Sequence, residues 1–170
     1  DIIAYVATSL DGYLAAPDGT VSFLDDFGSD EYDFDGFFAS VGCLAMGSTT
    51  YEQVLGFGWP YGDRPCLVLT TRDLAIPDDG DVTFDDGPTG EALRSFATRH
   101  DSRLWVVGGG TVITAGIEAG AIDTLELYVM PVVLGDGIPL FSWAPGRSLQ
   151  LRETTPFENG VVRLVYAVGD

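Results

Sequence analysis

The chain of 170 residues carries a formal net charge of −18 and is 46% hydrophobic and 12% aromatic. This hydrophobic content excludes a disordered chain, and the length suits a single domain, residues 1–170, with a substantial core. No apolar run approaches the roughly 20 residues that a membrane-spanning helix needs, so no membrane partner is expected.

The charge balance argues against a nucleic-acid partner. The chain has 8 basic residues against 26 acidic ones, and all eight are arginines. Binding to nucleic acid needs a basic face that releases counterions, and this composition does not supply one. A salt-rich habitat and a GC-rich genome that replaces lysine with arginine both explain the acidity, and the sequence leaves both open. Residues 1–6 have the pattern of a first strand, not the basic start of a signal peptide, so we expect a cytoplasmic protein.

Continuous apolar runs predict buried parallel strands, and the first three occupy residues 2–8, 43–46 and 65–70. Between the first two strands, aromatic residues near helical spacing predict a helix over about 30–40, capped by Ser29. After the second strand, Thr49 and Glu52 have the spacing of a capping box.

The second half continues the alternation of strands and helices. It predicts a short strand at 82–84, a helix at 89–99, a strand at 104–107 and a helix from Thr111 to about Ala119. Residues 124–130 alternate polar and apolar, as in a strand covered on one face. Asn159 and Gly160 then separate two strand-like segments, which is a strong hairpin signal. The sequence therefore predicts an α/β fold of three layers, with helices on both faces of a mixed, mainly parallel sheet and an antiparallel C-terminal hairpin.

The clearest functional signal is the turn of Gly108, Gly109 and Gly110 between a buried strand and a helix. Glycines let a ligand approach the backbone, and the unpaired N–H groups of a helix start attract an anion such as phosphate. Packing alone also explains such a turn. A second junction of this kind follows the second strand at Gly47, and Arg72, just beyond the third strand, is either a bidentate phosphate ligand or a solvated side chain.

Cys43 and Cys66 stand alone in apolar segments. Their spacing fits neither a zinc site nor a disulfide framework, so we expect two buried thiols and no metal site. The only histidine, His100, follows a predicted helix and is expected to interact with its last carbonyl groups.

Several motifs occur together and in order along nearly the whole chain: residues 9–12, 46–52, 107–110, 125–127, 131 and 134–141. In combination they resemble the dihydrofolate-reductase-like superfamily, and within it the C-terminal reductase domain of RibD-type riboflavin-biosynthesis enzymes and its stand-alone relatives. The resemblance implies a dihydrofolate-reductase-like fold, a homodimer, and NADPH bound across the C-terminal ends of the strands. It also implies an oxidoreductase that transfers hydride to a small heterocyclic or carbonyl substrate, similar to 5-amino-6-(5-phosphoribosylamino)uracil reductase.

The resemblance implies site residues as well. Residues expected to bind the cofactor are Gly47, Ser48, Thr49, Thr50, Thr70, Thr71, Arg72, Gly108, Gly109, Gly110 and Thr111. Those expected near the nicotinamide and the substrate are Ser9, Asp11 and Gly12. Asp11 is the candidate catalytic residue, as a substrate-binding group or a general acid, although an aspartate also caps turns of this kind. If the acid lies on the first helix, as in true dihydrofolate reductases, the available residues are Asp25, Asp26, Asp30 and Glu31.

This chain departs from the family pattern at one phosphate-binding position. Family members commonly carry Gly-Arg-x-Thr where this chain has Gly47-Ser48-Thr49-Thr50, so a preference for NADPH over NADH depends on Arg72. The few basic residues and the missing deaminase domain argue against the phosphorylated riboflavin-pathway substrate, for which Arg64 and Arg147 are the remaining candidate ligands. The alternatives are true dihydrofolate reductase activity and a non-catalytic NADP(H)-binding sensor or scaffold.

Overall fold

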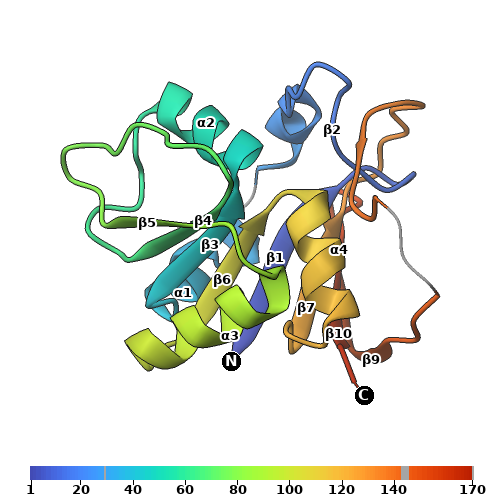
Figure 1. The fold of residues 1–170 in the computed structure, drawn as a ribbon. Coiled ribbons are helices and arrows are strands. Elements are labelled where there is room, and N and C mark those ends of the chain that lie inside the picture. The colour runs from blue at the N-terminus through green and yellow to red at the C-terminus, as the bar shows by residue number, and fades with distance from the viewer. Residues whose placement is uncertain (29, 143–145, 170) are drawn as a thin grey trace.

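The computed structural model describes residues 1–28, 30–142 and 146–169. One twisted sheet crosses the molecule in the strand order β5-β4-β3-β6-β1-β7-β10-β9 (Figure 1). Pairing is parallel from β5 to β7, whereas β10 pairs antiparallel with both β7 and β9. The strands are β1 (Ile2–Thr8), β3 (Cys43–Gly47), β4 (Cys66–Leu69), β5 (Val82–Asp85), β6 (Leu104–Gly108), β7 (Thr124–Val129), β9 (Gln150–Pro156) and β10 (Val162–Ala167). The predicted mixed, mainly parallel sheet is confirmed.

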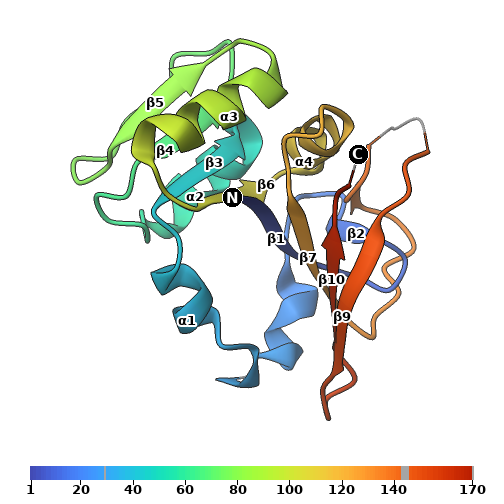
Figure 2. The ribbon, with the colours of Figure 1, turned by 90° about the horizontal axis from the view of Figure 1, so that it is seen from below.

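Helices cover both faces of this sheet. Helices α3 (Thr89–His100) and α4 (Gly110–Glu118) pack on one face against alternate strand residues such as Ala4 and Val106. Helices α1 (Phe34–Ala39) and α2 (Ser48–Phe57) pack on the other face, against Leu44, Met46 and Trp105. Figure 2 shows α3 and α4 on the side of the sheet opposite to α1. Because side chains alternate along a strand, both faces of the central strands are apolar, as the continuous hydrophobic runs predicted.

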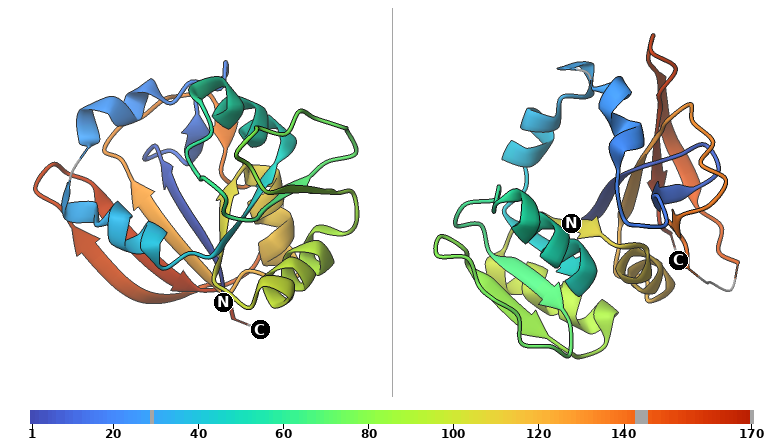
Figure 3. Two further views of the ribbon diagram at one scale, coloured as in Figure 1. Left: turned by 90° about the vertical axis from the view of Figure 1, so that its left-hand side faces the viewer. Right: turned by 90° about the horizontal axis from the view of Figure 1, so that it is seen from above.

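The helix predicted over residues 30–40 is shorter than expected. Two 3-10 turns, η1 (Ser22–Phe27) and η2 (Asp30–Tyr32), precede α1, and these three elements lie on one side of the central strands (Figure 3). Asp33 adopts a left-handed conformation with φ of 48°, which separates η2 from α1, and its side chain accepts a hydrogen bond from the Gly36 N–H at 3.2 Å. The predicted cap Ser29 lies outside the described residues. The aromatic residues expected to form a buried face are only partly covered: Phe37 and Phe38 pack against the core, whereas Phe34 is 43% exposed.

The capping-box prediction for α2 is wrong. The helix begins at Ser48, directly after the extended residue Gly47, and no side chain caps it. Thr49 therefore lies within the first turn, and Glu52 pairs with Arg72 instead. Helix α4 likewise begins at Gly110, one residue before the predicted start, and has no side-chain cap.

The C-terminal hairpin and the buried thiols are as predicted. Gly160 has φ of 90°, and the Phe157 N–H donates to the Val161 carbonyl at 2.9 Å to close the turn. Cys43 and Cys66 are free and buried, and burial raises the pKa of Cys66 to about 12. A separate two-stranded sheet joins β2 (Tyr13–Ala15) to β8 (Ile138–Pro139). None of the helices in the described ranges is long and apolar enough to cross a membrane.

Candidate active site

A cavity of about 870 Å³ lies where the central parallel strands end. Both glycine junctions line it: residues 47–50 after β3 and residues 108–111 after β6. They are adjacent because β3 and β6 are neighbours in the sheet, with Met46 paired to Gly108. The structure therefore brings together eight of the eleven residues that the sequence predicted to bind a cofactor: Gly47, Ser48, Thr49, Thr50, Gly108, Gly109, Gly110 and Thr111.

Glycine occupies the three positions of the second junction for different structural reasons. Gly110 packs so tightly that a Cβ there would collide with the carbonyl oxygens of Pro139 and Leu140. Gly108 has φ of 145°, which L side chains rarely adopt. At Gly109 the backbone has φ of −83°, and a Cβ would meet only the Thr50 Oγ1 at 3.5 Å, which is an ordinary contact. Close packing therefore requires glycine at position 110, and the backbone conformation favours glycine at position 108. Neither reason applies to Gly109, and the space beside it belongs to the cavity.

The starts of α2 and α4 give this end of the cavity a positive potential. The N-cap residues of the two helices are Gly47 and Gly109, so no N-cap side chain accepts a hydrogen bond from the backbone N–H groups of the first turn. A helix start carries a partial positive charge and binds anions, phosphates in particular. Two such starts in one cavity suit the two phosphates of a dinucleotide.

The remaining predicted cofactor residues, Thr70, Thr71 and Arg72, lie outside the cavity lining. The Arg72 guanidinium makes a bidentate contact with Glu52 of α2, at 3.3 Å and 2.9 Å. Thr70 accepts a hydrogen bond from the Arg72 N–H at 3.0 Å, which shapes the turn after β4. Both Arg72 and Glu52 are about half exposed, so their ion pair is free to exchange with other partners.

The predicted substrate-side residues, Ser9, Asp11 and Gly12, also lie outside the cavity lining. The Asp11 carboxylate accepts hydrogen bonds from the Ser9 hydroxyl at 2.6 Å and from the backbone N–H groups of Gly135 at 2.8 Å and Leu134 at 3.1 Å. The Ser9 hydroxyl, followed by these N–H groups, lowers the pKa of Asp11. Asp11 thus joins the loop after β1 to the loop after β7.

None of the other charged candidates lines the cavity: Asp25, Asp26, Asp30, Glu31, Arg64 and Arg147. The Arg64 guanidinium lies 3.7 Å from the centre of the Phe38 ring, and Arg147 donates to the carbonyl groups of Glu118 and Gly169. Uncharged neighbours of the acidic residues, among them Leu24 and Phe27, do line it.

Sequence reasoning missed the other end of the cavity, which is aromatic and apolar. Its residues come from β1, β6, the segment 22–34, and β7 with the residue after it, and they include Tyr5, Leu24, Phe27, Tyr32, Phe34, Trp105, Tyr128 and Met130. The rings pack closely: the centre of Tyr5 lies 5.1 Å from that of Tyr128, which in turn lies 5.3 Å from Tyr32. We refer to these eight residues as the aromatic wall.

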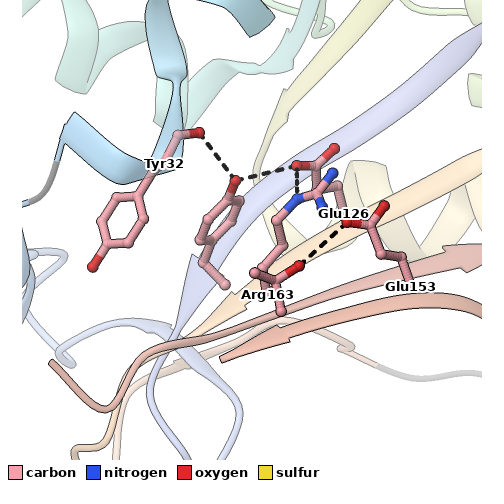
Figure 4. Close-up of polar contacts among 6 residues, drawn as sticks. Tyr32, Glu126, Glu153 and Arg163 are labelled. Atoms are coloured by element: carbon pink, nitrogen blue, oxygen red, sulfur yellow. Dashed lines mark hydrogen bonds and ion pairs between the residues drawn. The ribbon is translucent and has the colours of Figure 1, made fainter. Parts of the chain in front are cut away.

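Behind the aromatic wall lies a buried carboxylate, Glu126, which is 8% exposed. It accepts hydrogen bonds from Arg163 Nε at 2.6 Å and from the Tyr128 hydroxyl at 3.2 Å (Figure 4). Arg163 also donates to Glu153 at 2.6 Å. Burial raises the pKa of Tyr128, so its phenol stays protonated. The alternation of polar and apolar residues over 124–130 places Glu126 and Tyr128 on the same face of the strand. The pattern predicted that this face lies in solvent, but Tyr32 and Phe157 cover Tyr128.

Comparisons with known proteins found relatives that match over nearly the whole chain. The protein of Bacillus subtilis (strain 168) called YwjB, which is uncharacterized, is 35% identical over 167 residues, or 94% of this chain and 93% of YwjB. A solved structure from Shewanella sp. PV-4, described as a putative riboflavin biosynthesis protein, has a TM-score of 0.84 and 25% identity over 98% of this chain and 97% of that one.

Two more distant structures share the fold. Acinetobacter baumannii RibD has a TM-score of 0.74 and 17% identity, over 98% of this chain and 57% of that one. Dihydrofolate reductase from Enterococcus faecalis, complexed with NADP(H), has a TM-score of 0.71 and 18% identity, over 99% and 96%. These confirm the predicted dihydrofolate-reductase-like fold. A model of the RibD C-terminal domain matches residues 1–163, and the chain belongs to that family.

Proposed function

We propose that this protein is an NADPH-dependent reductase that transfers hydride to a small heterocyclic or carbonyl substrate. The observation that carries the proposal is the pair of uncapped helix starts, α2 and α4, which open into one cavity opposite the aromatic wall. The family assignment supports a reductase of the riboflavin-pathway kind. The shared fold of a dihydrofolate reductase complexed with NADP(H) supports the choice of cofactor.

In this proposal the pyrophosphate of NADPH binds between the two glycine junctions. The N–H groups at the starts of α2 and α4 hold it, with the hydroxyls of Ser48, Thr49, Thr50 and Thr111 in reach. Thr70, Thr71 and Arg72 serve the adenosine end, where Arg72 exchanges Glu52 for the 2′-phosphate. The bound cofactor supplies the hydride, and the protein contributes orientation and the exclusion of water.

Ser9, Asp11 and Gly12 act on the substrate side by positioning. The Gly12 carbonyl accepts a hydrogen bond from the Leu140 N–H at 2.9 Å, and Asp11 fixes the loop after β7. These bonds hold β2 and β8, whose residues Leu14, Ala15 and Ile138 line the cavity. The role that we assign to Asp11 is therefore indirect.

We also propose a homodimer. The strand β9 forms one edge of the sheet, and its residue Leu151 is 51% exposed. An edge strand with exposed apolar side chains favours pairing with another copy. Light scattering coupled to gel filtration tests this, and a mass of one chain at all concentrations would exclude the dimer.

A charged substitution at the start of α4 tests the proposed cofactor site. Thr111 lines the cavity and is exposed, so Thr111→Asp and Thr111→Asn should both fold. We expect Thr111→Asp to weaken NADPH binding at least tenfold, because its carboxylate repels the pyrophosphate, while the melting temperature holds or rises because an acid suits a helix start. The nearly isosteric Thr111→Asn should bind NADPH almost as the wild type does. Calorimetric titration with NADPH measures this. Absence of NADPH binding to the wild type at low and high salt, or equal binding by both variants, would refute the proposed site.

A further inference from the structure

The lining of the cavity is uncharged as far as the structure describes the chain. Across the described parts of the chain, no Asp, Glu, Arg or His lines it, although the protein carries 26 acidic and 8 basic residues. The helix starts of α2 and α4 are its only strong anion-binding groups among these residues, and the proposed function assigns them to the cofactor. Burying an anion without a cationic partner is costly, so a phosphorylated or carboxylated substrate has no counter-charge at the aromatic wall.

The polar atoms of the aromatic wall already have protein partners. The Tyr32 hydroxyl donates to the Phe27 carbonyl at 2.6 Å and accepts from the Asn159 side chain at 2.6 Å. The Trp105 indole N–H donates to the Tyr5 carbonyl at 3.1 Å. The wall therefore offers a substrate mainly ring surface.

Glu126 and Arg163 stabilise this arrangement from behind. The Tyr128 hydroxyl is held by Glu126, and the Tyr5 ring packs against Tyr128 with 5.1 Å between the ring centres. In Figure 4, Glu126 and Arg163 lie together, with Tyr32 on the opposite side of the cluster. Burial raises the pKa values of Tyr5 and Tyr128, so neither phenol supplies a negative charge to the cavity.

We propose that the aromatic wall takes an uncharged, planar, conjugated carbonyl compound of the quinone or enone class. Flat π-systems gain most from stacked and edge-on aromatic contacts, and they need few hydrogen bonds. The inference rests on the proposed function, because the same cavity holds the cofactor that reduces this substrate. It separates this protein from reductases whose substrate carries a phosphate.

The proposed reduction needs no charged side chain of the protein. The substrate accepts a hydride at the electrophilic carbon of its conjugated system, so one C–H bond of NADPH breaks and one C–H bond of the substrate forms. The displaced π-electron pair moves to the carbonyl oxygen, which makes the substrate an enolate or a phenolate, and NADP⁺ is the oxidised product. Solvent water donates a proton to that oxygen, or to the adjacent carbon, as the charge develops, and the hydroxide that remains returns to bulk solvent.

A matched pair of probes tests the charge preference. The ketone 2-acetonaphthone and the carboxylate 2-naphthoate have nearly the same shape, and they differ in charge. Calorimetric titration into the full chain, with and without NADP⁺, should show at least tenfold tighter binding of the ketone. Oxidation of NADPH by 1,4-naphthoquinone should exceed the rate without protein. Equal or tighter binding of 2-naphthoate, or no binding of either probe, would overturn the inference.

A pair of variants tests whether the preference for the ketone arises in the cavity. Val21 lines it at its rim and is 40% exposed, whereas Val133 is 68% exposed and lies outside it. Val21→Arg should reduce the preference for the ketone at least fivefold by supplying a cation, and the matched Val133→Arg should leave it unchanged. An equal effect of both variants would overturn the inference. Titration with NADPH in parallel separates the two proposals: failure to bind NADPH refutes the cofactor site, while the probe ratio still decides the substrate class.

Discussion

At the scale of single residues, the Glu126 cluster shows how the wall of the cavity is fixed. Glu126 has two neighbouring donors, Arg163 and Tyr128, and its side chain is 11% exposed. Arg163 also contacts Glu153, whose side chain is 56% exposed. The two acidic partners of one arginine therefore differ mainly in burial.

This difference predicts unequal effects of two identical substitutions. Glu126→Gln should lower the free energy of unfolding by about 1–3 kcal/mol, because Arg163 loses its buried charge partner. Glu153→Gln should cost less than about 1 kcal/mol, as expected for an exposed pair. Urea denaturation of both variants measures the difference. Equal losses would contradict the argument that burial makes the Glu126 pair the stronger of the two.

The hydrogen bonds of Asp11 predict a pH dependence. Its pKa is lowered in the folded protein, first by the Ser9 hydroxyl and then by backbone N–H groups. A lowered pKa adds stability that is present above the unfolded value of about 3.9 and is lost as the pH falls through the folded value. Asp11→Asn should therefore be less stable than the wild type at pH 7, and the two should converge in strong acid while NADPH binding at pH 7 is kept. Thermal unfolding from pH 7 to pH 2 checks this. Loss of NADPH binding in a folded Asp11→Asn would instead indicate direct contact with the ligand.

At the scale of elements, the two glycine junctions were predictable, but the helix caps were not. An apolar run followed by glycine fixes the end of a strand locally. A capping box requires the helix to begin one residue after the cap, and here α2 follows β3 without a gap, so Thr49 is already helical. The uncapped start that results is what makes α2 a candidate anion site.

The ion pair that joins Glu52 of α2 to Arg72 in the turn after β4 predicts a preference for NADPH over NADH. Arg72→Ala should weaken NADPH about tenfold and leave NADH nearly unchanged, because only NADPH carries the 2′-phosphate. Glu52→Gln should strengthen NADPH binding severalfold, since it frees the Arg72 guanidinium from its bidentate partner. Titrations with both nucleotides decide this. Equal weakening of NADPH and NADH by Arg72→Ala would contradict the role of Arg72.

At the scale of the whole molecule, the net charge of −18 acts against the compact state. Salt screens repulsion between exposed carboxylates, so raising NaCl from 10 mM to 500 mM should add about 1 kcal/mol of stability, or roughly 2–4 °C in melting temperature. Asp78 and Asp79 are exposed neighbours, and replacing both by Asn should reduce this salt dependence. Scanning calorimetry measures it. A melting temperature that falls with NaCl would show that the ion pairs outweigh the repulsion.

The sequence by itself determined the order and type of nearly every strand, the family and the two glycine junctions. These features are encoded locally, by continuous apolar runs, by glycine and by short motifs in order. Even there, the start of α1 was misplaced, because the left-handed Asp33 interrupts a periodic aromatic segment.

Only the tertiary structure decided what the cavity contains. Its aromatic wall combines Tyr5, Trp105 and Tyr128 with the segment 22–34, and these meet because β1, β6 and β7 are neighbours in the sheet although they are far apart in the chain. Asp11 and Arg72 lie in the loops that follow β1 and β4, at the carboxyl ends of these parallel strands, yet neither lines the cavity. The sequence determines which strand end each of these residues follows. Its tertiary partner then determines where the charged group lies: Glu52 holds the Arg72 guanidinium, and the Gly135 N–H holds the Asp11 carboxylate.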